Sequence, residues 1–296
     1  MVSGLVDRGQ REVGESFVVG PFGVGTWSLD GTSVGEVITL LETALECGIN
    51  LLDTADVYGK EFGAVESLLG RAFSASRGLR DRFVLAGKSG IVPGTPYDSS
   101  THHLRTACEA TLSRLGVDVI DVFQIHRPDS FTHPGEVADA LIVLHEQGKI
   151  REVGVSNHSP AQVSALQAHL PLELATIQPE LSLTHLDPIY DGTLDQALEL
   201  GLTTFAWSPL ANGRLATGEG VSAELAVVID DLAQREEVGR GEVALAFVLA
   251  HPAAPVALLG TRQPERLRSA VRALGVSLDR TDLYRLIEAS TGRPLP

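Results

Sequence analysis

The sequence contains few cysteines and comparatively few positive charges. Cys47 and Cys108 are the only two cysteines among 296 residues, too few for a disulfide framework. Both fall in helix-like segments, where the ordinary role is a buried small hydrophobic side chain and a redox role is rarer. The chain carries 23 Lys and Arg against 38 Asp and Glu, a formal net charge of −15. A phosphate-binding surface needs clustered Lys and Arg, so we expect no nucleic-acid partner.

Long hydrophobic runs are also missing. No stretch approaches the roughly 20 apolar residues that span a bilayer. The opening segment, MVSGLVDRGQREVGES, lacks the apolar centre of a secretory signal peptide. We therefore expect a cytoplasmic protein with no membrane partner. Residues 1–15, roughly, are polar and are expected to form a flexible N-terminal segment.

The sequence does contain a regular alternation of short apolar runs and longer segments with helical periodicity. Eight runs are typical of strands: residues 22–27, 49–52, 83–86, 119–125, 152–155, 174–177, 203–206 and 256–259. Helical patterns cover residues 34–45, 64–73, 102–115, 136–147, 161–169, 194–200, 223–236, 243–250 and 282–289.

This alternation predicts a single-domain (β/α)₈ barrel, or TIM barrel, over residues 1–296. The connections are long enough for parallel strand pairing, and no linker-like stretch divides the chain. A doubly wound open sheet is the alternative, and it would carry a Gly-x-Gly-x-x-Gly turn after an early strand. Here Gly23-Val24-Gly25 is followed by Thr26-Trp27-Ser28, which has a different spacing. The closed barrel is therefore favoured.

Polar or glycine residues follow nearly every strand-like run. In a barrel the carboxyl ends of the strands converge on one face, where active sites are built. A single cavity is therefore expected to be ringed by Asp53, Lys88, His126, Ser156, Asn157, Gln178 and Ser208. Each has an ordinary alternative when taken singly, such as a turn cap for Asp53 or a structural role for His126. Their coincidence at strand ends favours a functional site.

Tyr58 completes a proton-donating set with three of these residues. A lone tyrosine is a poor acid near neutral pH because its reference pKa is about 10. A cation at Lys88 would lower that pKa, and a carboxylate at Asp53 would keep the lysine charged. A histidine at position 126 can hydrogen-bond a carbonyl oxygen. Side chains carry no hydride, so reduction by this set implies a nicotinamide cofactor.

Seven segments resemble the aldo-keto reductase family over almost the whole chain, in the family's order and spacing. They are LLDTADVYG (51–59), LAGKSG (85–90), VIDVFQIHRPD (119–129), IREVGVSN (150–157), TIQPELS (176–182), AWSPLANGRL (206–215) and LLGTRQPERL (258–267). Within the family, GKIREVGVSN and HRPD are similar to a bacterial branch of oxidoreductases of the YdhF type.

The resemblance implies an enzyme that reduces an aldehyde or ketone to an alcohol with NADPH. Its catalytic tetrad would be Asp53, Tyr58, Lys88 and His126, with Tyr58 as the general acid. Ser156, Asn157 and Gln178 would hold the nicotinamide carboxamide, and Trp207 would stack on the ring. The partner implied is a small carbonyl substrate.

The resemblance also assigns the rest of the cofactor site. Gly25, Thr26 and Trp27 would line the cofactor and substrate mouth, and Asp53 would also contact the cofactor. Ser208, Leu210, Asn212 and Arg214 would approach the pyrophosphate, and Gly260, Arg262 and Arg266 would approach the adenosine phosphate. Ser269-Ala270 stand where many members carry a Glu-Asn pair near the adenine. The two arginines suit a 2′-phosphate, which favours NADP(H).

Two other interpretations stay open. A lysine at a barrel strand end also suits a Schiff-base aldolase with Lys88 as the nucleophile, although residues 156–157 and 207–210 would then lack a purpose. Some relatives bind NADP(H) as redox-sensing subunits with little turnover. We expect no metal site, and a monomer or a weak homo-oligomer.

Overall fold

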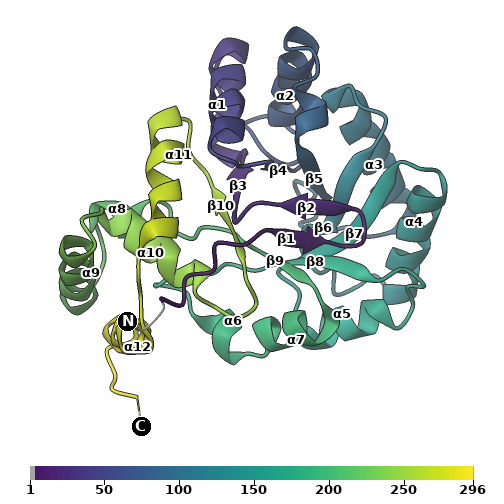
Figure 1. The fold of residues 1–296 in the computed structure, drawn as a ribbon. Helices are drawn as coiled ribbons and strands as arrows, with labels where there is room; N and C mark the ends of the chain where they lie inside the picture. Colours follow the sequence, from purple (N-terminus) through teal and green to yellow (C-terminus); the bar gives the residue numbers. More distant parts are fainter. Residues whose placement is uncertain (1–3, 296) are drawn as a thin grey trace.

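The strands of the barrel close in sequence order in the computed structural model, which describes residues 4–295 (Figure 1). In order they are β3 (Phe22–Gly25), β4 (Leu51–Asp53), β5 (Val84–Ser89), β6 (Ile120–Ile125), β7 (Ile150–Ser156), β8 (Leu174–Gln178), β9 (Thr203–Ala206) and β10 (Val256–Leu259). All neighbours are parallel, and β10 pairs with β3. The predicted single-domain (β/α)₈ barrel is confirmed, and the closure excludes the open sheet.

Helices surround the barrel (Figure 1). The longer ones are α1 (Val34–Glu46), α2 (Ala64–Ala75), α3 (Thr101–Leu115), α4 (Pro134–Glu146), α5 (Pro160–Gln167), α7 (Thr193–Leu200), α9 (Ala223–Arg235), α10 (Arg240–Leu249) and α12 (Arg280–Thr291). Capping boxes begin α1 at Ser33, α5 at Ser159 and α12 at Asp279, where a side chain accepts from the third helical N–H. No helix within residues 4–295 is long and apolar enough to cross a membrane.

Six short helical elements were not predicted. They are α6 (Asp187–Tyr190), α8 (Arg214–Thr217), α11 (Pro264–Ala270) and the 3₁₀ turns η1 (Trp27–Leu29), η2 (Arg80–Arg82) and η3 (Val271–Gly275). Segments of one or two turns contain too few residues to show a helical period, so sequence pattern does not reveal them.

Alternation along each strand separates two apolar layers. Leu52 and Leu85 point outward and pack against the helices, whereas Leu51, Val84 and Val122 belong to a separate core inside the barrel. Inward positions change from apolar to polar along the strand: on β5, Ala86 belongs to the inner core, and Lys88, two residues later, forms an ion pair with Asp53 of the neighbouring strand. The polar end of the inner face is therefore the carboxyl end of the strands.

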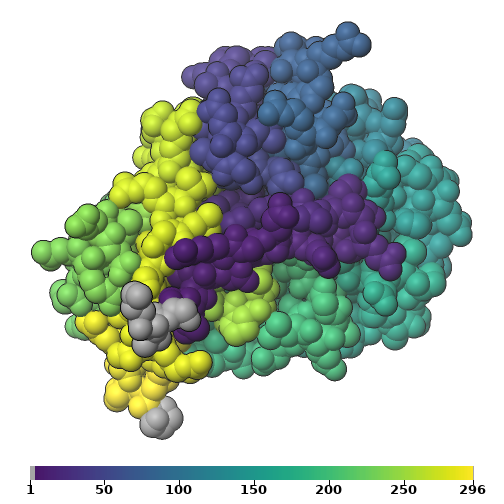
Figure 2. All heavy atoms as spheres, viewed as in Figure 1, coloured from purple at the N-terminus to yellow at the C-terminus, as the bar shows by residue number. Residues whose placement is uncertain are grey.

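A hairpin closes the opposite, amino-terminal end of the barrel. Its antiparallel strands β1 (Arg11–Val13) and β2 (Phe17–Val19) cross the face seen in Figure 2. Val13 and Val19 are fully buried and join the inner core with Phe205. Part of the segment expected to be flexible (residues 1–15) thus has a defined place, because it covers apolar side chains that would otherwise meet water. Residues 1–3 of that segment lie outside the described residues.

Candidate active site

The four residues of the predicted tetrad meet at the carboxyl end of β4, β5 and β6. Asp53 ends β4, Lys88 lies on β5, His126 follows β6, and Tyr58 lies in the loop between β4 and α2. The Lys88 Nζ donates to Asp53 Oδ1 at 2.5 Å, and both residues are buried. The same nitrogen lies 5.4 Å from the centre of the Tyr58 ring. The Tyr58 and His126 rings meet edge to face, with centres 5.8 Å apart.

Burial determines the protonation of His126. It lowers the pKa of His126 well below 6.5, and the positive charges of Lys88 and Arg127 lower it further. The imidazole is therefore neutral near neutral pH, with one N–H available to donate to a carbonyl oxygen.

The pKa of Tyr58 shifts in the direction opposite to the one expected, which was a lowering by Lys88. Burial raises the pKa of Tyr58 well above 10, the negative charge of Asp53 adds to the rise, and the guanidinium of Arg127 opposes it. The Lys88 charge does not reverse this, because a carboxylate 2.5 Å away compensates it. Tyr58 is therefore a protonated phenol in this structure, because burial and the charge of Asp53 stabilise its protonated form.

A chain of buried amides orients Asp53; Gln178 was predicted to ring the cavity, and Gln124 was missed by sequence analysis. Gln178 Nε2 donates to Asp53 Oδ1 at 2.9 Å and to Gln124 Oε1 at 3.2 Å. Gln124 Nε2 in turn donates to Thr176 Oγ1 at 2.9 Å. A Cβ at Gly154 would lie 1.9 Å from that hydroxyl oxygen, so the network needs glycine there. Gln124 does leave a sequence signal, since it is polar inside a β-type run and lies two residues before a predicted site residue.

The residues expected at the nicotinamide carboxamide lie together beside this network. Ser156 Oγ donates to the backbone carbonyl of Gln178 at 2.9 Å, and Asn157 Nδ2 donates to Ser156 Oγ at 2.8 Å. Trp207 Nε1 donates to Asn157 Oδ1 at 3.0 Å. Asn157 has a φ of 58°, a left-handed conformation that asparagine tolerates better than most residues. The four predicted residues thus form one polar corner of the site.

The expected mouth residues follow β3. Gly25 pairs with Asp53, and the backbone N–H of Thr26 donates to the Asp53 carbonyl at 3.0 Å. The Thr26 hydroxyl is buried and has no hydrogen-bond partner within residues 4–295. Trp27 is 67% exposed, so a large aromatic surface stands open at the rim.

The residues expected near the cofactor phosphates lie on the two segments that follow β9 and β10, which are neighbouring strands. In the first loop, Ser208 and Asn212 have positive φ and are joined by a 3.3 Å hydrogen bond between their side chains. Leu210 lies between them in the chain, and Arg214 begins α8 directly after the loop. The second loop, from Gly260, carries Arg262, and Arg266 lies in helix α11, which follows that loop. Both arginines are exposed and have no ion-pair partner among the described residues. Both positive charges therefore remain available to a ligand.

Ser269, which stands where many family members carry a Glu-Asn pair near the adenine, forms a hydrogen bond within the protein. Its hydroxyl donates to Glu242 Oε1 of α10 at 2.5 Å. The serine that departs from the family pattern therefore has a hydrogen-bond partner inside the protein.

Arg127 is a further residue that sequence analysis passed over. It follows His126 directly, and its guanidinium carbon lies 5.8 Å from the centre of the Trp207 ring. The structure shows no hydrogen bond or ion pair from this guanidinium to any residue in 4–295, although its charge lowers the pKa of both Tyr58 and His126. An unpaired cation thus stands beside the tetrad.

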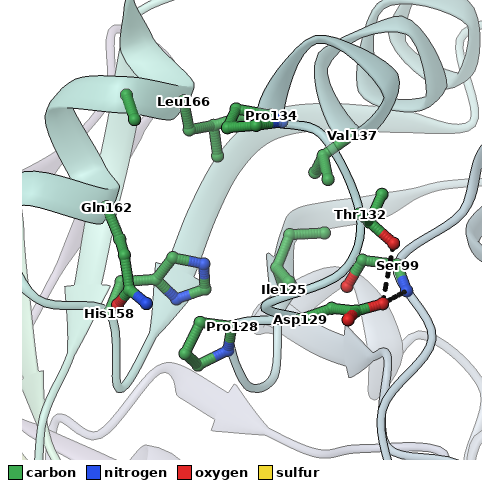
Figure 3. Close-up of a pocket in the computed structure, with 11 residues that line it drawn as sticks. Ser99, Ile125, Pro128, Asp129, Thr132, Pro134, Val137, His158, Gln162 and Leu166 are labelled. Atoms are coloured by element: carbon green, nitrogen blue, oxygen red, sulfur yellow. Dashed lines mark hydrogen bonds between the residues drawn. The ribbon is translucent and has the colours of Figure 1, made fainter.

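A hollow lies outside the barrel wall, beside the loops that follow β6 and β7 (Figure 3). It lies between the loop after β6 and helices α4 and α5, with His158 on one side and Asp129 on the other. His158 donates from Nδ1 to the Ser156 carbonyl at 2.9 Å, and burial lowers its pKa to about 4. Asp129 accepts from the Ser99 N–H at 3.0 Å and the Thr132 hydroxyl at 2.7 Å. Ile125 lines it and belongs to the outer core, so the hollow is separate from the inner face of the tetrad.

In the part of the chain that the structure describes, no group of three or more His, Cys, Asp or Glu side chains is placed to hold a metal ion.

Comparisons with known proteins agree with this geometry. The sequence model of the aldo/keto reductase family matches residues 21–290. The chain is 43% identical over 294 residues to a 6-dehydroglucose reductase of Novosphingobium aromaticivorans, covering 97% of each. It is 35% identical over 291 residues to oxidoreductase YdhF of Escherichia coli, covering 95% of each. The structure of the thermostable aldo-keto reductase Tm1743 with the inhibitor epalrestat superposes with a TM-score of 0.82 at 26% identity, covering 95% of this chain and 99% of that one.

The amide network predicts a stability effect at Gln124. Gln124→Met keeps the side-chain length but leaves Thr176 Oγ1 without its donor and Gln178 Nε2 without one acceptor. The free energy of unfolding in urea should fall by about 1–3 kcal/mol, the usual cost of an unsatisfied buried polar group. Gln234→Met, on the exposed face of α9, is the matched control and should stay within about 0.5 kcal/mol of the unmodified protein. Equal stability of the two variants would show that the network does not support the fold.

Proposed function

The chain belongs to the aldo/keto reductase family, and from that membership we propose that it is an NADPH-dependent enzyme that reduces an aldehyde or ketone to an alcohol. The family and its YdhF-like branch are as the sequence predicted. The observation that carries the proposal is the meeting of Tyr58, His126 and the buried Lys88–Asp53 pair at the carboxyl ends of three neighbouring strands.

The residues of the site support a division of labour. When bound, the nicotinamide supplies hydride to the carbonyl carbon. The neutral His126 donates a hydrogen bond to the carbonyl oxygen and orients it. As negative charge develops on that oxygen, the Tyr58 hydroxyl transfers its proton to it, giving the alcohol and a phenolate. Lys88, held by Asp53, keeps positive charge next to that phenolate.

The residues present fit a dinucleotide phosphate. Ser156, Asn157 and Gln178 supply amide and hydroxyl groups in one corner, and the Trp207 ring lies beside them. The buried hydroxyl of Thr26 has no protein partner within residues 4–295, as expected of a group that waits for a ligand. Exposed, unpaired guanidinium groups at positions 262 and 266 suit a phosphate ester.

We further propose a substrate rich in hydroxyl groups. The relative from Novosphingobium is named a 6-dehydroglucose reductase, and its similarity extends over 97% of both chains. The unpaired guanidinium of Arg127 supplies donors for hydroxyl oxygens close to the tetrad. Trp27 exposes an aromatic face of the kind on which a sugar ring packs.

The geometry disfavours the aldolase interpretation. A Schiff base requires Lys88 as a free amine, whereas its Nζ is fully buried and bonded to the Asp53 carboxylate. A redox-sensing subunit with little turnover would retain the same side chains. Only a measurement of turnover therefore distinguishes it from the proposed enzyme.

A panel of carbonyl compounds followed by NADPH absorbance tests the proposal. It should include 6-dehydroglucose, simple aldehydes, ketones and quinones. The unmodified protein should oxidise NADPH with at least one of them. Tyr58→Phe should lose about 10²–10⁴-fold in turnover, the usual contribution of a general acid, while NADPH binding stays nearly unchanged. Wild-type rates in Tyr58→Phe would remove Tyr58 as the acid, and cofactor binding without turnover on any compound would favour the redox-sensing subunit.

Cofactor preference is the second expected outcome. NADPH should bind more tightly than NADH, and Arg262→Ala with Arg266→Ala should weaken NADPH selectively, by about 1.5–3 kcal/mol for each charge-assisted contact. Arg268→Ala is the control on α11, because that guanidinium is already paired with Glu46 at 2.9 Å. Titration calorimetry gives both dissociation constants. Equal values for NADPH and NADH in the unmodified protein would refute the assignment of these arginines to a 2′-phosphate.

A further inference from the structure

Asp56 carries a buried carboxyl next to the site. The reaction described above does not use this carboxyl. It lies two residues before Tyr58, and its backbone N–H donates to the Lys88 carbonyl at 3.1 Å. Its side chain is fully buried, and neither carboxyl oxygen has a hydrogen-bond partner of normal geometry within residues 4–295. Burying an unsatisfied carboxyl costs free energy, so its presence calls for a physical reason.

The groups that face Asp56 come from three elements. Ser89 on β5 brings its hydroxyl beside the carboxyl, Glu66 comes from α2, and Arg114 comes from α3. Glu66 is itself fully buried and forms an ion pair with Arg114 Nε at 2.6 Å. It also accepts from Thr111 Oγ1 at 3.0 Å. Arg114 is thus paired with the buried carboxyl of Glu66, and its charge also acts on the buried carboxyl of Asp56.

Asp56 changes protonation near neutral pH. Burial raises the pKa of Asp56 to about 7, the negative charge of Glu66 adds to the rise, and Ser89 and Arg114 oppose it. Below that pH the carboxyl is neutral, and above it the carboxyl is ionised.

The charge on Asp56 acts on the catalytic groups. Its negative charge raises the pKa of Tyr58, where it adds to burial and Asp53 and is opposed by Arg127. It also raises the pKa of Lys88, together with Asp53 and Glu66, against the larger effect of burial. Within residues 4–295 the Asp56 carboxyl makes no hydrogen bond or ion pair with the side chain of Tyr58 or Lys88, so its influence on them passes through charge alone.

From this placement, and resting on the proposed reductase activity, we propose that Asp56 is a positioning residue that sets the proton-donating strength of Tyr58. The neutral carboxyl leaves the phenol free to give up its proton. The ionised carboxyl adds a negative charge beside the phenolate that forms and so opposes the transfer. Reduction should therefore slow as the pH rises through about 7.

The test compares the pH profile of kcat for reduction in the unmodified enzyme, Asp56→Asn and Glu66→Gln. The unmodified enzyme should slow by about threefold to tenfold as the pH rises through neutrality. Asp56→Asn has the same shape and no ionisable proton, so it should stay at the faster level throughout. Glu66→Gln removes the charge that raises the pKa of Asp56, so the fall should move to lower pH. A merely structural role for Asp56 would change the rate and leave the shape of the profile intact, which would overturn the proposal.

Infrared difference spectra supply a readout that does not depend on turnover. A protonated-carboxyl C=O band should disappear as the pH rises through about 7 in the unmodified protein, and Asp56→Asn should lack that band. If no carbonyl compound is reduced, the proposed function fails while the titrating band still supports the placement of Asp56. If the unmodified protein reduces a carbonyl compound but shows no such band, the inference about Asp56 fails and the proposed function stands.

Discussion

The buried ion pair between Lys88 and Asp53 is the constraint on which the site depends. Both charges are almost wholly removed from water and lie 2.5 Å apart. Taking two charges out of water costs several kcal/mol, which mutual attraction offsets only when further hydrogen bonds satisfy the pair. Gln178 provides such a bond to Asp53, Gln124 accepts a second bond from Gln178, and Thr176 accepts one from Gln124. The inner face of the barrel is polar at this end because the pair requires it.

Burial also fixes the protonation of the groups around the pair. The same exclusion of water keeps His126 neutral and Tyr58 protonated, so the site holds two donors without an added proton. The helix side of β5 continues this pattern with Asp56, Glu66 and Arg114. The reacting groups are thus influenced from inside the barrel and from behind its wall.

Sequence periodicity was enough to predict the eight barrel strands and to bring Asp53, Lys88 and His126 to one face, because strand ends and parallel pairing are local properties. It missed the β1–β2 hairpin, whose three-residue strands show no period. It also missed Gln124, Arg127 and Asp56 as site residues. Their roles depend on which side chains surround them across several elements, and spacing along one segment does not contain that information. The expected direction of the Tyr58 pKa shift was wrong for the same reason, since burial and the charge of Asp53 raise that pKa.

The most direct test of the account is single-turnover oxidation of bound NADPH by a reactive aldehyde in the unmodified protein, Lys88→Met and Lys60→Met. Lys60 is exposed and serves as the control. Because Lys88→Met leaves Asp53 unpaired, the double variant Asp53→Asn/Lys88→Met is measured as well, to separate lost chemistry from lost folding. The account predicts that both Lys88 variants bind NADPH and oxidise it far more slowly, while Lys60→Met keeps the unmodified rate. A Lys88→Met variant as fast as the unmodified protein, or borohydride trapping of an aldehyde on Lys88, would contradict it.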